Sequence, residues 1–417
     1  MTVHQLRTRS PAEAALLESA ERAGNVGSAA ASAIDALRRE GLPNRRTEAW
    51  HYTDLRGLMG RLPGAEAGAV EATRDQDAAL LAPLLHNSHV VEMSAPEATG
   101  TVEGVRITAL DEAADWNRSP NHLDRPIDTV RLVNAAFGAP GVAVDVAADT
   151  ALAAPIELRS GTGDRGHGFA RCRVGERARA TFVERIEGNS TGTPSTGVSH
   201  LVIADGAEVL WIIDQAKGPS AAHLGQLNVT VGADAVFKLF VLNSGGALVR
   251  NEVHVESIGE NSEIRIRGVN LLSEGQHVDV TTTLRHQVPN TTATETFRNV
   301  VMGGHGVFQG MIKVAKDAQK TDAKMACNTL LLSENGDFSA KPELEIFADD
   351  VQCGHGATAG EINADHLFYL MSRGIPEKPA RALLVKAFVA EVVEELEDEA
   401  AGDALMERID AWLTQQR

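Results

Sequence analysis

The middle of the chain shows a recurring pattern of short apolar runs that alternate with polar positions and are separated by turn residues. From about residue 130 to about residue 360, a glycine followed by a small or acidic residue repeatedly introduces such a run. Four of these glycines are Gly175, Gly206, Gly232 and Gly259, which lie 31, 26 and 27 residues apart. Alternating apolar and polar residues predict β-strands, and each interval is long enough to hold two or three of them.

This regular spacing favours a parallel β-helix, in which every turn stacks its strands on those of the turn before. A meander sandwich would instead place its strands about 8 to 12 residues apart. A β-helix also agrees with a mostly aliphatic core, since aromatic residues make up 4% of the chain. We therefore predict a mainly β fold with a right-handed parallel β-helix core over residues 101–362. An irregular β-sandwich with coincidental glycines is the alternative that the pattern leaves open.

Both ends of the chain are predicted to be helical. Pro11 begins PAEAALLESAERA, which is rich in alanine, leucine and glutamate and has proline at a favourable first helical position. We expect an N-terminal, mainly helical domain over residues 1–100. Near the other end, NADHLFYLMSRGIP offers Asn363 or Asp365 as a helix start and Gly374 as a stop, and two amphipathic segments follow. We expect a C-terminal helical domain over residues 363–417.

Acidic residues outnumber basic ones, 57 to 39, which gives a formal net charge of −18. Nucleic-acid backbones and anionic membranes attract basic surfaces, so neither is expected to be a partner. Three cysteines (Cys172, Cys327 and Cys353) are too few for a disulfide framework and favour a reducing compartment. The sequence begins without a charged-then-apolar leader and contains no apolar run of about 18 residues, so we predict a cytoplasmic protein.

Gly161–Gly166 match the dinucleotide-binding pattern G-x-G-x-x-G. That fingerprint requires a helix that starts at the glycines and directs its N-terminus at the pyrophosphate. Here GFARCRVGERARATF follows, which is typical of a strand and a corner, so we predict a turn without a nucleotide. The sequence also lacks a G-x-x-x-x-G-K-[ST] loop, so we predict no ATP site in this chain and expect any ATP coupling to come from a partner.

Cys353 and His355 are the strongest metal-ligand candidates. In an extended strand, residues two apart point to the same side. A thiolate and a neutral imidazole are good ligands for zinc or iron. Two ligands cannot complete a four-coordinate site, so the others would have to come from another turn or another subunit. The structural alternative is a cysteine in the apolar interior and a histidine at a glycine-flanked corner.

Two other charged groups are less informative. The segment MIKVAKDAQKTDAKM forms a basic stretch that is compatible with anion binding, although a solvated edge balanced by nearby acids fits an acidic protein better. Asp349 and Asp350 resemble the paired carboxylates of a β-helix enzyme that cleaves polysaccharides. Adjacent strand residues point to opposite faces, however, so these two would not flank one bond unless the chain bends there.

Several long segments resemble the SufB/SufD family of iron–sulfur cluster assembly proteins. The segments are ETFRNVVMGGHGVFQGMIKVAKDAQKTDA and LLLSENGDFSAKPELEIFADDVQCGHGATAGEINADHLFYLMSRGI, and similarity is dense from about Glu295 to Ile375. RTEAWHYTDL at residues 46–55 is similar to a motif of the SufD branch. SufB proteins carry extra cysteines, and this chain has none before Cys172, so the resemblance to the SufD branch is greater.

The resemblance implies a β-helix core between helical domains and a non-catalytic scaffold subunit of the SUF complex. It implies pairing with SufB through the β-helices and binding of the SufC ATPase by the C-terminal helices. A SufB-like scaffold acting as a homodimer is the alternative, and the chain alone is also compatible with a homodimer. A β-helix carbohydrate enzyme is the third and weakest interpretation.

The resemblance also implies roles for particular residues. His355 would face SufB and help to bind iron or a transient iron–sulfur cluster shared with SufB, and Cys353 would be a second ligand. A reduced flavin in the complex is a further implication, although no residue of the sequence locates its site. The residues implied to contact the ATPase are Arg381, Leu384, Phe388, Glu391 and Glu395.

Overall fold

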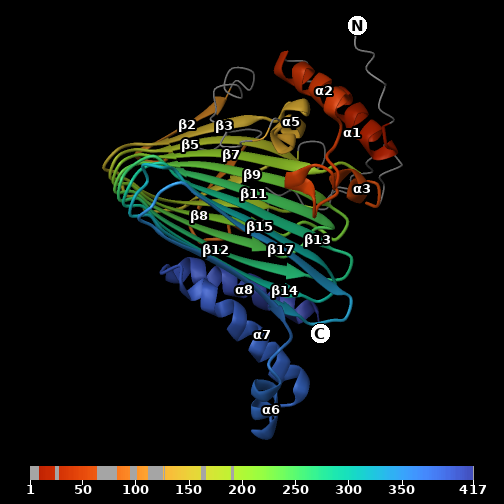
Figure 1. The fold of residues 1–417 in the computed structure, drawn as a ribbon. Coiled ribbons are helices and arrows are strands. Elements are labelled where there is room, and N and C mark those ends of the chain that lie inside the picture. The colour runs from red at the N-terminus through yellow and green to blue at the C-terminus, as the bar shows by residue number, and fades with distance from the viewer. Residues whose placement is uncertain are drawn as a thin grey trace.

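The computed structural model describes residues 9–23, 28–62, 82–93, 101–110, 125, 127–160, 166–188 and 192–416. Within these residues, two nine-stranded sheets face each other, and the chain passes alternately from one sheet to the other (Figure 1). This arrangement is a β-helix with helices at both ends of the chain. The prediction of a mainly β fold with a β-helix core is therefore confirmed.

Each sheet takes every second strand of the chain, with the exception of β2 and β3, which follow each other. Sheet A consists of β1 (His89–Glu92), β4 (Ile156–Arg159), β6 (Arg179–Ile186), β8 (Glu208–Gln215), β10 (Val236–Asn243), β12 (Glu263–Leu272), β14 (Thr292–Val301), β16 (Asp322–Leu331) and β18 (Gln352–Gly360). Sheet B consists of β2 (Val105–Leu110), β3 (Gly141–Val146), β5 (His167–Val174), β7 (Ser195–Ile203), β9 (Ala222–Val231), β11 (Leu248–Ser257), β13 (His277–His286), β15 (Gly304–Val314) and β17 (Gly336–Ile346). Neighbouring strands pair in parallel, apart from β2, which is antiparallel to β3.

One turn of the β-helix contains two strands and about 27 to 30 residues. The register along sheet A shows this spacing, because each turn begins at a residue that lies directly above its counterpart in the turn before. These residues are Glu208, Val236, Glu263, Thr292, Asp322 and Gln352. Parallel pairing over successive turns excludes the β-sandwich alternative.

The corners between sheet B and sheet A explain the recurring glycines. A Cβ atom at Gly259 would lie 1.8 Å from the backbone nitrogen of Ala233, so only glycine permits the corners of successive turns to stack this closely. A second device is a column of residues in the left-handed conformation, among them Asp234 and Asn290, with φ of 53° and 60°. Their N–H groups donate to a carbonyl of the next corner, as Asp234 does to Glu260 at 2.9 Å.

The interior combines apolar stacks with one polar ladder. Phe182 and Trp211 stack on successive turns of sheet A, with ring centroids 5.1 Å apart. Beside these stacks, Asn243, Asn270 and Asn299 lie in register, and each donates its side-chain amide to the next polar side chain along the axis. Buried amides are stable in an apolar core only when they are hydrogen-bonded, so the ladder fixes the register of neighbouring turns.

The N-terminal elements cover the outer face of sheet B. They are α1 (Pro11–Arg22), α2 (Ser28–Glu40), η1 (Glu48–Trp50), α3 (Leu55–Met59) and α5 (Thr129–Ala136). Their apolar side chains form one buried cluster with residues of sheet B. At its edge, the buried guanidinium of Arg250 lies 4.0 Å from the ring centroid of Trp50 and forms ion pairs with Glu252 and Asp279. Residues 63–81 and 94–100 of the expected N-terminal domain lie outside the described residues.

The C-terminal helices are α6 (Ala364–Ser372), α7 (Glu377–Glu394) and α8 (Glu399–Gln415). α7 and α8 cover the outer face of sheet A, where residues such as Val389 and Ile409 are fully buried. α6 buries no side chain and extends away from the sheets, at the bottom of Figure 1. The Asn363 side chain accepts hydrogen bonds from the first turn of α6, as expected for a helix start. Within the described residues, no helix is both long and apolar enough to cross a lipid bilayer.

Candidate functional site

The candidate site lies in the last turn of the β-helix. β17 and β18 are the final strands of sheets B and A, and no other strand in the described part of the chain pairs with their outer edges. They have 11 and 9 residues, so two long rows of backbone N–H and C=O groups are left without a strand partner. Such an edge is a template for pairing with another chain.

Cys353 and His355 both lie on β18 and on the side that continues the interior of the β-helix. Cys353 is in register with the buried Ala323 of β16, and His355 is in register with the buried Met325. Cys353 packs against the interior cluster, whereas His355 is exposed. The structure thus brings together the thiol and the imidazole that the spacing in the sequence predicted to share one side.

The three cysteines lie in different environments. Burial raises the pKa of the Cys353 thiol, and the negative charge of Asp322 adds to this effect, so the thiol is protonated at neutral pH until a metal displaces its proton. Cys327 is fully buried on β16, accepts a hydrogen bond from Asn299 at 3.2 Å, and has a pKa raised by burial to about 12. Burial also raises the pKa of Cys172. Cys353 is therefore the cysteine best placed to act as a ligand.

The chain supplies an incomplete ligand set at this position. Among the described residues, no group of three or more histidine, cysteine, aspartate and glutamate side chains is arranged to hold a metal ion. The donors of the last turn therefore need further ligands from elsewhere, or a rearrangement of their own, before they can form a closed coordination sphere.

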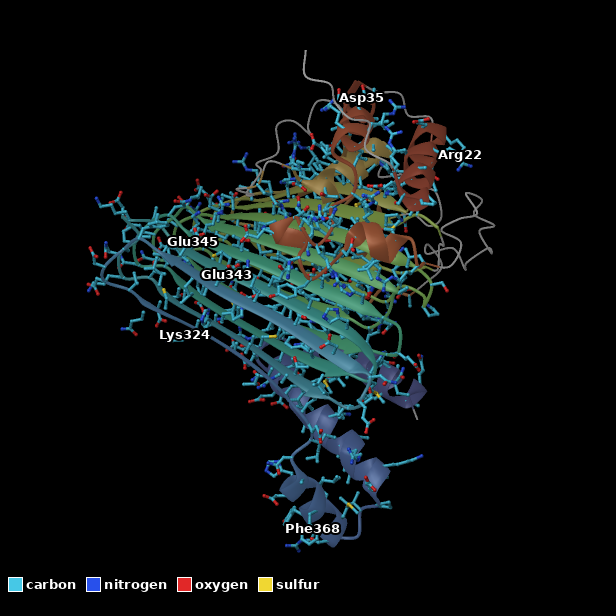
Figure 2. All side chains as sticks on the ribbon, turned by 45° about the vertical axis from the view of Figure 1, so that its right-hand side comes forward. Arg22, Asp35, Lys324, Glu343, Glu345 and Phe368 are labelled. Carbon is cyan, nitrogen blue, oxygen red and sulfur yellow. The ribbon has the colours of Figure 1, made fainter. Side chains whose placement is uncertain are left out.

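The charged residues around the last turn are largely paired with each other. Figure 2 labels Glu343 and Glu345 on β17 of sheet B and Lys324 on β16 of sheet A. Lys313 pairs with Glu345 at 2.9 Å, and Lys324 pairs with Asp322 at 3.0 Å. The lysine-rich segment therefore forms a solvated edge with neighbouring acids.

Two other sequence motifs do not contribute to the site formed by Cys353 and His355. Asp349 and Asp350 are exposed in the turn before β18, and the Asp350 carboxylate pairs with Lys320. Residues 161–165 of the glycine-rich motif lie outside the described residues. Strand β5 rather than a helix follows the motif at His167, as the sequence after the motif predicted.

The residues expected to contact an ATPase fall into two groups. Arg381 is exposed and Leu384 is partly exposed, near the start of α7. The other three attach α7 to sheet A. Glu391 pairs with Arg298 at 2.6 Å, and the Arg298 guanidinium lies 4.8 Å from the ring centroid of Phe388.

Glu395 forms an equivalent ion pair with Arg267 of β12.

A more exposed apolar surface lies nearby. Phe368 and Tyr369 of α6 are 72% and 57% exposed, and Leu383 of α7 is 49% exposed. Figure 2 shows Phe368 at the tip of the helical extension, far from the sheets. The amphipathic pattern of α7 did not reveal this surface, because it does not distinguish a face covered by the same chain from a face left free.

Comparison with known proteins matches the region that contains this site. The family model "SUF system FeS cluster assembly, SufBD core domain" matches residues 167–388, from β5 to the middle of α7. The chain is 28% identical over 401 residues to the iron–sulfur cluster assembly protein SufD of Escherichia coli (strain K12), which covers 90% of each chain. It is 27% identical over 398 residues to an iron–sulfur cluster assembly SufBD family protein of Synechocystis, covering 89% of this chain and 87% of the relative.

A SufBD family protein of Mycobacterium leprae is 28% identical over 391 residues, covering 89% of this chain and 91% of the relative. Each of these alignments covers most of both chains. The family model itself includes the last turn, α6 and the first part of α7.

Proposed function

Because the chain belongs to the SufBD family of iron–sulfur cluster assembly proteins, we propose that it is a non-catalytic scaffold subunit of the SUF complex. In this proposal it pairs with a SufB protein, binds the SufC ATPase, and contributes ligands to iron or to a nascent cluster. The observation that carries the proposal is the last turn, which presents Cys353 and His355 beside two sheet edges that no described strand covers.

The backbone of β18 supports pairing with a second β-helix. The N–H of Gln352 donates to the carbonyl of Thr321 at 2.9 Å, toward the interior of sheet A. In a parallel sheet, alternate residues bond to opposite neighbours, so the N–H groups of Cys353, His355 and Ala357 point to the free edge. A β-helix with a matching edge would continue both sheets and carry its own side chains to within reach of His355.

The ligand chemistry of this interface suits iron as cargo. Imidazole nitrogen and thiolate sulfur both bind iron, and a SufB subunit across the interface would supply the remaining ligands. Since Cys353 is protonated when the chain is alone, metal binding there is coupled to release of a proton.

The exposed apolar residues of α6 and the start of α7 are the surface that we assign to the ATPase. Phe368, Tyr369 and Leu383 provide aromatic and aliphatic anchors, with Arg381 and Leu384 at their border. Movement of a bound ATPase would act on α7. The pairs that Arg298 and Arg267 form with α7 would then transmit this movement to β14 and β12, and from there to the last turn.

Replacement of His355 tests the proposal. We expect His355→Ala to leave the complex with SufB and SufC assembled and to reduce iron and sulfide recovered with the anaerobically purified complex. His86→Ala is the matched control, since His86 is also exposed but lies next to β1, at the opposite end of the β-helix. Unchanged cluster formation by His355→Ala would refute the assignment of His355 as a ligand. Failure of the wild-type chain to co-purify with SufB or with SufC would refute the scaffold role.

A further inference from the structure

The interior of the last three turns contains a column of potential metal donors. Glu295 of β14, Met325 of β16 and His355 of β18 are in register on sheet A and share its inward face. Adjacent strands are about 4.8 Å apart, so the Glu295 and His355 backbones are separated by about 10 Å. Earlier in the same column, the corresponding residues are Trp211, Leu239 and Ile266.

Glu295 is poorly matched to its surroundings. The side chain is 1% exposed, and within the described residues its two carboxylate oxygens have no hydrogen bond within normal distance. Burial raises its pKa to about 7, which Thr282 and Arg267 offset only in part. A buried carboxyl group that lacks hydrogen bonds or a nearby positive charge destabilises the folded state. An isoleucine such as Ile266 fills the same column without this loss of stability. Packing therefore does not account for a glutamate here.

Met325 separates Glu295 from the open end. A Cβ atom at Gly310, on the facing strand β15, would lie 2.3 Å from the sulfur of Met325, so the methionine side chain crosses to sheet B and fills the space that this glycine leaves. Methionine has three flexible side-chain torsions and adapts to irregular spaces. A different rotamer of this one side chain would open the column between the carboxylate and the imidazole.

We propose that Glu295 is an internal ligand for the divalent iron ion that His355 binds, reached when the Met325 side chain turns aside. This inference rests on the proposed iron-binding role of His355. A carboxylate and an imidazole are both suitable ligands for Fe²⁺, and the thioether of Met325 lies between them. The ion supplies the positive charge that the buried carboxylate lacks.

Metal titration of the assembled complex tests the inference. Co²⁺, whose visible absorption reports its ligands, is added to complexes that contain the full-length wild-type chain or a variant. We expect Glu295→Gln to weaken Co²⁺ binding at least about tenfold and to change the absorption spectrum. Glu184→Gln is the matched control, because Glu184 is a second buried glutamate of sheet A whose carboxylate accepts a hydrogen bond from Ser199. We expect it to bind Co²⁺ like the wild type.

A second variant tests access to the column. Met325→Ile keeps an apolar side chain but makes it stiff at the β-carbon, so it should block the path and weaken binding while Glu295 remains in place. Wild-type affinity and spectrum in Glu295→Gln, or in Met325→Ile if the former does not fold, would overturn the inference and leave His355 as a ligand. Wild-type binding in His355→Ala would instead remove the proposed iron site itself.

Discussion

The two ends of the β-helix differ in how they treat their sheet edges. At the first end, sheet A begins with β1, which has four residues, and sheet B begins with β2, which runs antiparallel to β3. At the last end, β17 and β18 are long strands, and no other strand of the described residues pairs with their outer edges. A short strand and a reversed strand are poor templates for a further parallel turn, whereas a long parallel edge invites one. Among the described residues, the sheets thus end in poor templates at one end and in long parallel edges at the other.

The interiors of the two ends differ as well. Around the early turns, the column of sheet A contains large apolar side chains such as Phe182 and Trp211. In the last three turns, the same column contains Glu295, Met325 and His355. In this column, therefore, the early turns carry apolar side chains, and the last three turns carry side chains of the types that bind metals.

The largest expected effect comes from proline substitutions that compare the two edges directly. Ala357→Pro removes an N–H group that points to the free edge of β18 and breaks no ladder bond within the chain. We expect its affinity for the SufB partner to fall at least about 1,000-fold, or about 4 kcal/mol, because the ring blocks edge pairing. Size-exclusion chromatography of the co-expressed proteins measures the loss of the complex.

Ala109→Pro is the matched control at the first end. Ala109 is exposed on β2, and the hydrogen bond from Ala147 to Gly104 shows that its N–H points away from β3. We expect Ala109→Pro to form the complex like the wild type. Equal loss of the complex in both variants would mean that the two ends of the β-helix do not differ in their contribution to pairing with SufB.

The buried carboxyl of the last turns gives the next largest effect. The folded pKa of Glu295 is about 7, above its ordinary value of 4.5, so between these values the folded state keeps a proton that the unfolded state has lost. Stability therefore falls as pH rises through this window, and the full cost of about 3 kcal/mol is present above pH 7. We expect Glu295→Gln to be more stable than the wild type at pH 8, with the difference lost near pH 4.5.

Urea denaturation at several pH values measures this difference. Glu260→Gln is the control, since Glu260 is exposed at a corner, and its replacement should change stability by less than about 0.5 kcal/mol at any pH. A stabilisation by Glu295→Gln that is the same at pH 8 and pH 4.5 would show that the carboxyl charge is not the cause.

The smallest effect concerns the helical extension near the last end. Phe368→Asp replaces an exposed aromatic of α6, and we expect it to weaken SufC binding by about 2 kcal/mol, or about 30-fold, without lowering the thermal midpoint. Ile258→Asp, at an exposed apolar residue of a corner, is the control and should bind SufC normally. Normal binding by Phe368→Asp would place the ATPase on another surface.

The fold was predictable because its determinants are local and repeated. Glycines such as Gly259 recur where successive corners approach closely, and alternation placed Cys353 and His355 on one side of a strand. The helices at both ends carried ordinary start and stop residues, such as Pro11 at the start of α1 and Gly374 after the end of α6.

Contacts between turns were not predictable in the same way. Glu295 stands in the same column as His355, but the turns vary from 27 to 30 residues, so the column is visible only when the register of each turn is known. Phe388 and Glu391 attach α7 to sheet A through contacts with Arg298, which lies about 90 residues earlier in the chain. A single sequence provides no signal for such pairs.

The left-handed corner residues link successive turns of the β-helix by the same type of backbone hydrogen bond. Corner residues such as Asp234 and Asn290 supply an N–H to a carbonyl of the next corner, and the last such bond runs from Lys320 to Asp350 at 2.7 Å. Because every turn is shaped by the one before it, the last turn is already folded to receive a further unit of the same kind. A partner that docks there is recognised by its repeat geometry, so a homologous chain that arose by duplication would fit this end without the evolution of a new interface.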